Sequence, residues 1–159
     1  MKDIPECGVF VDVFPMDGLS DSYAKAKAIM KQNGRRMRIN AAIIRKKVEN
    51  KGKAILYKIC QILFTSKRLC RKIENSSVKY SFGHSQYVGV TCGFYGEREI
   101  MKKEIFSDVA KVEFEGRTFC APIKYDQYLK NMYGDYMQLP PVKKRVTHHS
   151  FVAYWKEKT

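Results

Sequence analysis

The 159-residue sequence lacks several patterns that would indicate a function class directly. Its five cysteines are widely spaced without a C-x-x-C pair, which argues against a zinc site and against a disulfide framework. The longest apolar stretch, residues 54–64, is interrupted by Lys58 and Gln61 and is too short to cross a bilayer. Neither G-x-G-x-x-G nor G-x-x-x-x-G-K-[ST] occurs, so the common glycine-rich nucleotide loops are excluded.

Further absences bear on compartment and partners. Residues 1–5 include Asp3 and Pro5 and lack the apolar run of a signal peptide. Together with cysteines that are most simply reduced thiols, this predicts a cytoplasmic protein. No zinc-finger spacing, RNP-type aromatic strand or K-homology loop accompanies the basic residues, so we expect no nucleic-acid partner.

The composition is that of one folded domain with an uneven charge distribution. Apolar residues make up 45% and aromatic residues 13% of the chain, which is enough for a packed core. The net charge is +14, yet residues 31–72 alone hold 14 Lys and Arg and one acid, Glu49. The remaining 117 residues hold 16 basic and 15 acidic side chains and are almost neutral. The excess charge therefore lies in one basic segment. We predict that residues 31–74, which contain this segment, form a helical insert.

Periodicity and turn residues predict a chain that is helical in its middle and richer in strands on either side. The predicted strands cover residues 8–14, 87–92, 111–114 and 117–120, the last two joined by a hairpin turn at Glu115-Gly116. A turn is expected at Asp17-Gly18. The predicted helices cover residues 23–31, which Asn33-Gly34 should end, then 37–48 and 53–72, and a last helix that opens at Pro122 and closes at Gly134.

Asp12 is the strongest candidate for chemistry. It is an acid in the middle of a strand that is otherwise apolar, between Val11 and Val13. Such a carboxylate can hold a divalent metal beside phosphate oxygens in phosphoryl-transfer sites. The competing interpretation is a carboxylate that is hydrogen-bonded to the backbone or to an arginine at the end of the strand.

Two later segments offer candidate substrate-binding residues. Tyr133-Gly134-Asp135-Tyr136 places an acid between two tyrosines, although a plain helix exit explains the pattern as well. The C-terminal cluster could bind a diphosphate or could be a solvated tail; it comprises Lys143, Lys144 and Arg145 with His148 and His149. The basic segment 31–72 could bind an anionic membrane or nucleic acid, or could simply be a solvated helical face.

Two sequence blocks are specific enough to suggest a family. Residues 9–19 read V-F-V-D-V-F-P-M-D-G-L, which is similar to the "hydrophobic-D-hydrophobic-F-P-h-D-G" segment of the LicD family. Residues 114–145 contain F-E-G-R-T-F-C-A-P, Y-D-Q-Y-L and Y-G-D-Y-M-Q-L-P-P followed by a basic stretch, which is similar to its carboxy-terminal signature. The chain therefore resembles the carboxy-terminal portion of a LicD-type domain, a family related to fukutin-type proteins.

The resemblance implies a partial nucleotidyltransferase-like fold of the α/β (α+β) class. We expect a short mixed sheet, the basic helical insert and a C-terminal hairpin–helix unit. The implied activity is transfer of phosphocholine from CDP-choline to a sugar hydroxyl of a bacterial surface glycan, lipopolysaccharide or teichoic acid, with magnesium as cofactor. Asp12 matches the third acid of the metal site. The expected substrate-binding residues are Asp17, Tyr133, Asp135, Lys143, Lys144, Arg145 and His148.

One departure from the family pattern qualifies this expectation. The family places a D-x-D pair well upstream of the V-D-V-F-P segment, and no D-x-D occurs in this sequence. We therefore expect that the chain by itself binds Mg-nucleotide weakly and turns over little, and that an upstream segment or partner chain supplies the metal-binding pair. The alternative is a catalytically degenerate module that binds membrane or polyanions. In either case the basic segment could hold the protein at the inner face of the cytoplasmic membrane.

Overall fold

The computed structural model describes residues 12–45 and 50–145. The helices are α1 (Tyr23–Ile44), α2 (Lys51–Leu63), α3 (Ser66–Ser77) and α4 (Tyr125–Tyr133). The strands are β1 (Asp17–Gly18), β2 (Tyr87–Gly89), β3 (Met101–Lys102), β4 (Val109–Phe114) and β5 (Arg117–Pro122). Short 3-10 helices are η1 (Phe82–His84), η2 (Gly96–Glu99), η3 (Lys103–Phe106) and η4 (Val142–Lys144). The fold is thus of the mixed α+β class that the sequence predicts.

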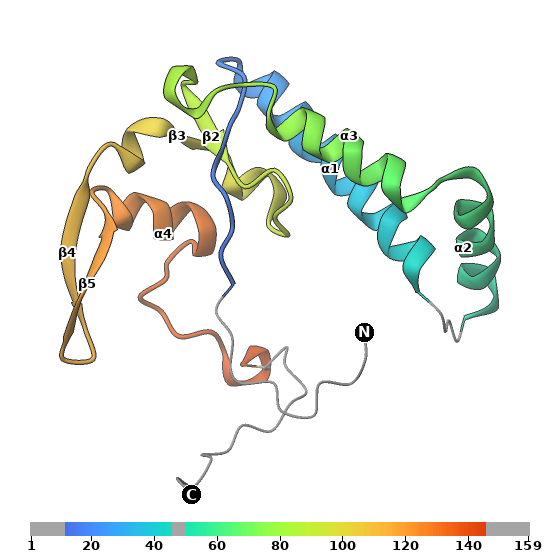
Figure 1. Ribbon diagram of the computed structural model, residues 1–159. Helices are drawn as coiled ribbons and strands as arrows, with labels where there is room; N and C mark the ends of the chain where they lie inside the picture. The colour runs from blue at the N-terminus through green and yellow to red at the C-terminus, as the bar shows by residue number, and fades with distance from the viewer. Residues whose placement is uncertain (1–11, 46–49, 146–159) are drawn as a thin grey trace, which may run out of the picture.

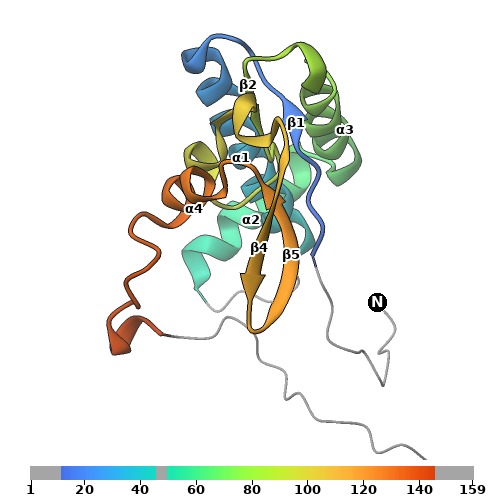
Figure 2. The same ribbon diagram turned by 90° about the vertical axis from the view of Figure 1, so that its left-hand side faces the viewer.

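A small sheet joins the two sides of the molecule. Its strand order is β1-β2-β3, and Val88 of β2 pairs with Gly18 on one side and Met101 on the other. On one side of this sheet, α1 and α3 lie side by side and α2 crosses their far end (Figure 1). On the other side, the β4–β5 hairpin extends away from the sheet with α4 beside it (Figures 1 and 2). All strand pairs in the described residues are antiparallel, so the parallel pairing that a mixed sheet would include is not seen there.

The predicted hairpin is confirmed in its turn and its register. β4 pairs with β5 from Val109 opposite Pro122 to Phe114 opposite Arg117. The two turn residues both have positive φ, 50° at Glu115 and 71° at Gly116, as a two-residue turn that matches the strand twist requires. Pro122 ends β5, and the following helix starts three residues later than predicted, at Tyr125.

The described residues contain two apolar clusters of buried side chains, which meet at neighbouring residues. One contains Leu19, Ala26, Met30 and Ile100 and joins α1 to the sheet. The other contains Met101, Ile105 and Met132 and joins β3 and η3 to α4. Ile100 of the first cluster and Met101 of the second are adjacent in the chain. The two clusters therefore meet at the start of β3 and connect the two sides of the molecule.

The predicted buried strand over residues 8–14 is wrong for the part that the structure describes. Asp12, Val13 and Phe14 form no strand, and Val13 is 89% exposed. Pairing begins only at Asp17-Gly18, the predicted turn, where Gly18 passes so close to Tyr80 and Ser81 that a Cβ would overlap their backbone. Residues 8–11 lie outside the described part. The β-branched run predicted burial, but no described strand pairs with residues 12–14.

The helix boundaries also differ from the prediction. α1 runs through Asn33-Gly34 without a break, because the fully buried Asn33 side chain donates to the Thr91 carbonyl and accepts from Arg36 and Ser76. The predicted helix over 37–48 is therefore the second half of α1, which ends at Ile44, and residues 46–49 lie outside the described part.

The predicted helix over 53–72 is two helices, α2 and α3. Phe64 and Thr65 separate them in extended conformation. The helical insert, predicted to end at residue 74, ends at Ser77, the last residue of α3. The strand predicted over 87–92 is shorter, because β2 ends at Gly89. None of the described helices combines the length and the apolar composition that a bilayer crossing needs.

Candidate active-site cavity

A cavity of about 460 Å³ opens where the N-terminal segment passes the loop after β2 and the end of α4. Its size is in the range of small-molecule sites. The second core cluster supports its floor through Met101 and Met132. The lining residues are Asp12, Phe14, Met16, Val90, Gly93, Phe94, Tyr95, Glu99, Met101, Tyr128, Met132 and Tyr133. Two residues that the sequence predicts to be functional, Asp12 and Tyr133, therefore line one cavity although they are far apart in the chain.

Glu99 is the functional candidate that sequence reasoning missed. It ends η2 and is only 6% exposed, whereas Glu97, two residues earlier, is exposed and forms an ion pair with Lys27 (Nζ to Oε1, 2.7 Å). Oε1 of Glu99 accepts a hydrogen bond from the Tyr95 backbone nitrogen at 3.4 Å, and Oε2 has no partner in the described structure. Burial raises the pKa of the Glu99 carboxyl, and the Tyr95 hydrogen bond opposes this only in part.

Gly93 makes room for this carboxylate. A Cβ at residue 93 would overlap both carboxylate oxygens of Glu99. The backbone nitrogen of Gly93 donates to the Val90 carbonyl, which places the glycine in a tight turn directly after β2. A glycine therefore sits at this position because the Glu99 carboxylate occupies the space of a side chain.

Aromatic rings form much of the cavity wall. The Tyr95 and Tyr133 rings meet edge to face, with centroids 6.1 Å apart and an interplanar angle of 80°. Tyr128 lies deeper, and burial raises the pKa of its hydroxyl. Phe94 is 86% exposed, so its ring is open to solvent at the cavity. The cavity thus combines two carboxylates with aromatic and thioether surfaces.

A larger depression of about 750 Å³ adjoins this cavity and has the opposite charge character. It runs along α1 and shares Gly93 and Phe94 with the first cavity. Lys27, Lys31 and Arg38 line it. Lys27 is paired with Glu97, whereas no ion pair of Lys31 or Arg38 is seen in the described residues. A cationic surface therefore lies next to the acidic, aromatic one.

The described residues do not by themselves fit a resident magnesium site. No group of three His, Cys, Asp or Glu side chains comes together among them. The second acid at the Asp12 cavity is Glu99, whose surroundings are aromatic rings and methionines rather than the water and oxygen ligands that Mg²⁺ prefers. We therefore derive no step through a metal ion.

Comparison with known proteins identifies a relative of this chain. No protein-family model matches the chain, and no solved structure matches it. The chain is 32% identical over 152 residues to the lipopolysaccharide cholinephosphotransferase LicD of Haemophilus influenzae, a match that covers 92% of this chain. This match supports LicD-family membership. The chain spans 57% of the length of that LicD protein.

The other acid of the LicD-like N-terminal block, Asp17, does not line the cavity. Its Oδ2 accepts a hydrogen bond from the Thr91 hydroxyl at 2.5 Å, and the Thr91 and Ser77 hydroxyls are also hydrogen-bonded to each other. Asp17 thereby connects β1, the loop after β2 and the end of α3. The geometry gives Asp17 a structural position, and its role in substrate binding stays a prediction.

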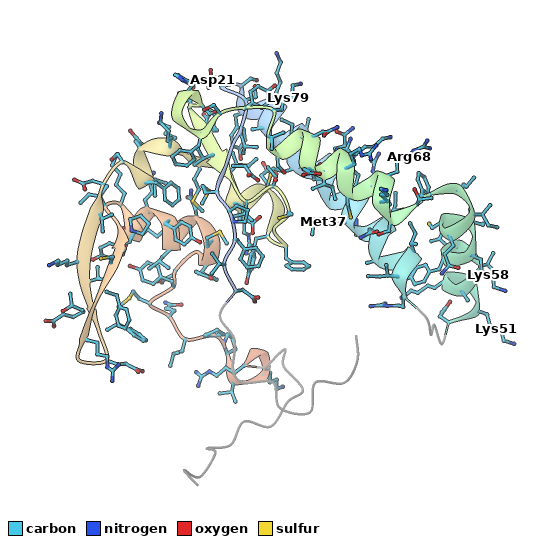
Figure 3. All side chains as sticks on the ribbon, in the orientation of Figure 1. Asp21, Met37, Lys51, Lys58, Arg68 and Lys79 are labelled. Carbon is cyan, nitrogen blue, oxygen red and sulfur yellow. The ribbon has the colours of Figure 1, made fainter. Side chains whose placement is uncertain are left out.

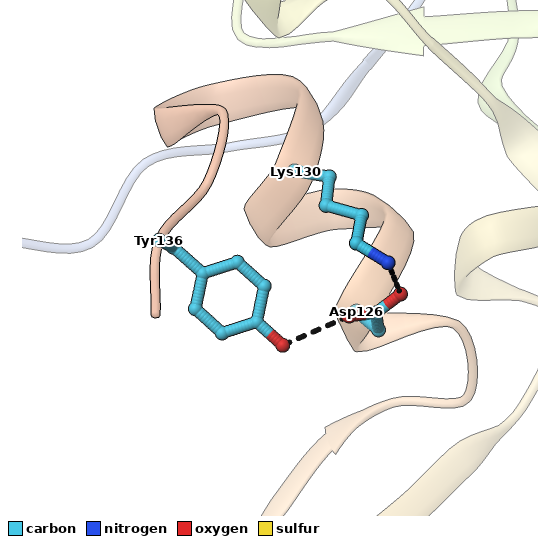
Figure 4. Close-up of polar contacts among 3 residues, drawn as sticks. All are labelled: Asp126, Lys130 and Tyr136. Atoms are coloured by element: carbon cyan, nitrogen blue, oxygen red, sulfur yellow. Dashed lines mark hydrogen bonds and ion pairs between the residues drawn. The ribbon is translucent and has the colours of Figure 1, made fainter. Parts of the chain in front are cut away.

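The LicD-like Y-G-D-Y segment is held by a hydrogen-bond network at α4. Gly134 ends the helix with φ 74°, as the sequence predicts, and the chain turns back so that the Tyr136 hydroxyl donates to Asp126 Oδ1 at 2.9 Å (Figure 4). Lys130 Nζ lies 2.8 Å from the other oxygen of the same carboxylate. Tyr133 faces the cavity, whereas Asp135 is exposed and does not line it.

Of the basic stretch after Y-G-D-Y, the side chains that the structure describes, Lys143 and Arg145, do not line the cavity. Arg145 Nε donates to the Pro140 carbonyl at 2.7 Å, and Lys143 is exposed. Lys144 belongs to η4, and His148 and His149 lie outside the described residues. Among the described residues, none that lines the cavity comes from this stretch, and a contact of Lys143, Lys144, Arg145 or His148 with a diphosphate stays a prediction.

Proposed function

We propose that this chain is part of a LicD-type transferase that moves phosphocholine, or a related phosphoalcohol, from a CDP-linked donor to a sugar hydroxyl of a bacterial surface glycan. The observation that carries the proposal is the similarity to LicD over 92% of the chain. Lipopolysaccharide is the first acceptor to test, because the relative is named for it, and teichoic acid is the second.

The two adjoining depressions support a donor of this chemical class. CDP-choline combines a cationic head group with an anionic diphosphate. The cavity at Glu99 offers carboxylates and aromatic rings, and the groove along α1 offers Lys31 and Arg38, with Gly93 and Phe94 common to both. A single ligand that spans them would place opposite charges against opposite surfaces.

Asp12 is the acid that we propose to act in transfer. Its exposed carboxylate lines the cavity, where it can contact the reacting phosphoryl group, its counter-ion or the incoming hydroxyl. In the transfer, the acceptor oxygen forms a bond to the phosphorus of phosphocholine, CMP leaves with the electron pair of the phosphoanhydride bond that breaks, and the hydroxyl proton passes to a general base, the role that we propose for Asp12. Because the described residues do not hold magnesium by themselves, the acid pair expected upstream would hold it, and we expect EDTA to abolish transfer by an enzyme that contains both parts.

A hybrid enzyme tests this proposal. The matching region of LicD is replaced by this chain and the hybrid is expressed in a Haemophilus influenzae strain that lacks LicD. We expect incorporation of labelled phosphocholine from CDP-choline into lipopolysaccharide. Asp12→Ala should reduce the rate by about 100-fold or more, as is usual for loss of an acid–base or metal-binding group.

The matched control for Asp12 is Glu113→Ala, which removes an exposed carboxylate from β4. This hybrid should keep the full rate. If the unsubstituted hybrid folds but modifies neither lipopolysaccharide nor teichoic acid, the proposed function is wrong. If the Asp12→Ala hybrid retains the rate of the Glu113→Ala hybrid, the role of Asp12 is wrong.

We also propose that α2 holds the protein against an anionic membrane surface. No residue of α2 is buried, and Ile55, Ile59 and Ile62 recur at helical spacing with exposures of 63%, 47% and 83%. Lys51 and Lys58 lie on the outer side of the same helix (Figure 3). Apolar side chains flanked by lysines are typical of helices that lie in the membrane interface.

Vesicle flotation tests this contact. The chain should float with vesicles that contain anionic lipid and remain behind with neutral ones. Ile55→Ser/Ile62→Ser should reduce the recovered fraction several-fold, whereas Val142→Ser, at a site 76% exposed outside α2, should not. Equal recovery with neutral and anionic vesicles would argue that the basic segment is only a solvated face.

A further inference from the structure

The charge of the cavity at Glu99 contrasts with the charge of the chain. The protein carries +14 overall, yet none of the twelve described residues that line this cavity is Lys, Arg or His. Two of them, Asp12 and Glu99, are acids. A cavity of this kind disfavours an anionic ligand and favours a cationic one.

The Glu99 carboxylate lacks a counter-charge within the described structure. Within residues 12–45 and 50–145, its Oε2 is buried without a hydrogen-bond partner, and the one hydrogen bond seen to the carboxylate is the long one from Tyr95. No ion pair of Glu99 is seen among the described residues. Burial of an unpaired carboxylate is costly, and a cation in the cavity would remove that cost. The position of Gly93 shows that the fold makes space for the carboxylate at this point.

The other side chains that line the cavity favour one kind of cation over others. A primary ammonium group needs several hydrogen-bond acceptors, and a hydrated metal ion needs oxygen ligands. The walls instead present the rings of Phe94, Tyr95 and Tyr133 and the thioethers of Met101 and Met132. Aromatic faces attract a quaternary ammonium group, which has methyl groups in place of N–H donors, and methionine side chains pack readily against such methyl groups.

We propose that this cavity binds the trimethylammonium group of choline, with Glu99 as its counter-ion and the rings of Tyr95 and Tyr133 as its aromatic walls. The inference rests on the proposed function only for the choice of choline as the ligand, since LicD is named as a cholinephosphotransferase. It goes further in locating the part of the chain that selects the head group. The donor's phosphates would then extend past Gly93 and Phe94 toward Lys31 and Arg38.

The methionines of the chain provide a test that does not depend on activity. Met16, Met101 and Met132 line the cavity, whereas Met30 and Met37 line the groove along α1. In a titration of the full chain with choline, followed by NMR of isotope-labelled methionine methyl groups, the first three signals should shift and saturate. The signals of Met30 and Met37 should stay in place.

The charge of the ligand is tested with the neutral carbon analogue of choline, in which a tert-butyl group replaces the trimethylammonium group. It has the same shape and should bind about tenfold more weakly or worse, since it lacks the cation–π and carboxylate attraction. Ethanolamine, which keeps the charge but has a primary ammonium group, should also bind more weakly than choline. Equal affinity for choline and its neutral analogue would overturn the proposal.

Substitutions test the carboxylate and the aromatic wall of the cavity separately. Glu99→Gln and Tyr133→Leu should each weaken choline binding about fivefold or more and leave binding of the neutral analogue unchanged. Tyr133→Phe, which keeps the ring, should bind choline like the parent chain. Glu97→Gln is the matched control, because Glu97 is exposed, lies in the same 3-10 helix and does not line the cavity. Circular dichroism of each variant confirms that it is folded before it is titrated.

The outcomes distinguish this inference from the proposed function. Choline-induced shifts confined to Met30 and Met37, or undiminished binding by folded Glu99→Gln and Tyr133→Leu, would overturn the inference even if the LicD hybrid is active. Saturable, charge-selective binding at Met101 and Met132 would support it. That result would stand even if the hybrid transferred no phosphocholine, in which case only the proposed function would be wrong.

Discussion

Gly93→Ala is expected to destabilise the protein only while Glu99 is present. The new methyl group overlaps the Glu99 carboxylate, and overpacking of this kind costs about 1–3 kcal/mol. Alanine also restricts the backbone of the unfolded chain more than glycine does, which offsets about 0.4–1 kcal/mol of this cost. This gain applies because φ of Gly93 is not in the positive range that favours glycine. The net loss in the free energy of unfolding should be about 0.5–2 kcal/mol. In a Glu99→Ala background the overlap is absent, and the same substitution should be neutral or stabilising.

Urea unfolding followed by circular dichroism measures the four free energies of this double-mutant cycle. The coupling between residues 93 and 99 should equal the overlap cost, about 1–3 kcal/mol, in the range of residues in direct contact. Gly83→Ala is the matched control, since its Cβ would meet only the Ser81 hydroxyl at 3.8 Å, and its effect should be the same in both backgrounds. A coupling below about 0.5 kcal/mol would refute the claim that Gly93 is there to accommodate Glu99.

Three further predictions concern the scaffold. Glu115→Asn should raise the thermal unfolding midpoint and Gly116→Ala should lower it, by about 1 kcal/mol each in stability, because both residues have positive φ. Asn33→Ala should cost about 1–3 kcal/mol in urea unfolding, since it leaves buried hydrogen-bond partners unsatisfied. The hydrogen bond from Lys130 lowers the pKa of Asp126, so its stabilising effect is present above the unfolded value near 3.9 and is lost as the pH falls through the folded value. Asp126→Asn should therefore flatten the fall in stability at acid pH, and an unchanged acid limb would contradict this.

The candidate site was only partly predictable from the sequence. Asp12 and Tyr133 are prominent because an acid among apolar residues and a tyrosine beside a helix-ending glycine are visible locally, and both line the cavity. Glu99 has no such signal. Glu97 and Glu99 are alike in the sequence, and only the packing of η2 turns one toward Lys27 in solvent and buries the other.

The amino-acid sequence alone determined the hairpin and the end of the last helix at Gly134, because turn residues and periodicity depend on a few neighbouring residues. The concentration of charge in residues 31–72 is likewise a property of the sequence. The two LicD-like blocks were visible in the same way, as residues in order along the chain. Tertiary structure alone decided that α1 continues through Asn33-Gly34, since the hydrogen bonds that stabilise Asn33 come from Thr91 and Ser76. It also decided that the run at Val13 forms no strand and that Gly93 faces Glu99. Contacts between distant segments depend on which surfaces meet in the fold, and a residue's immediate neighbours in the chain do not contain that information.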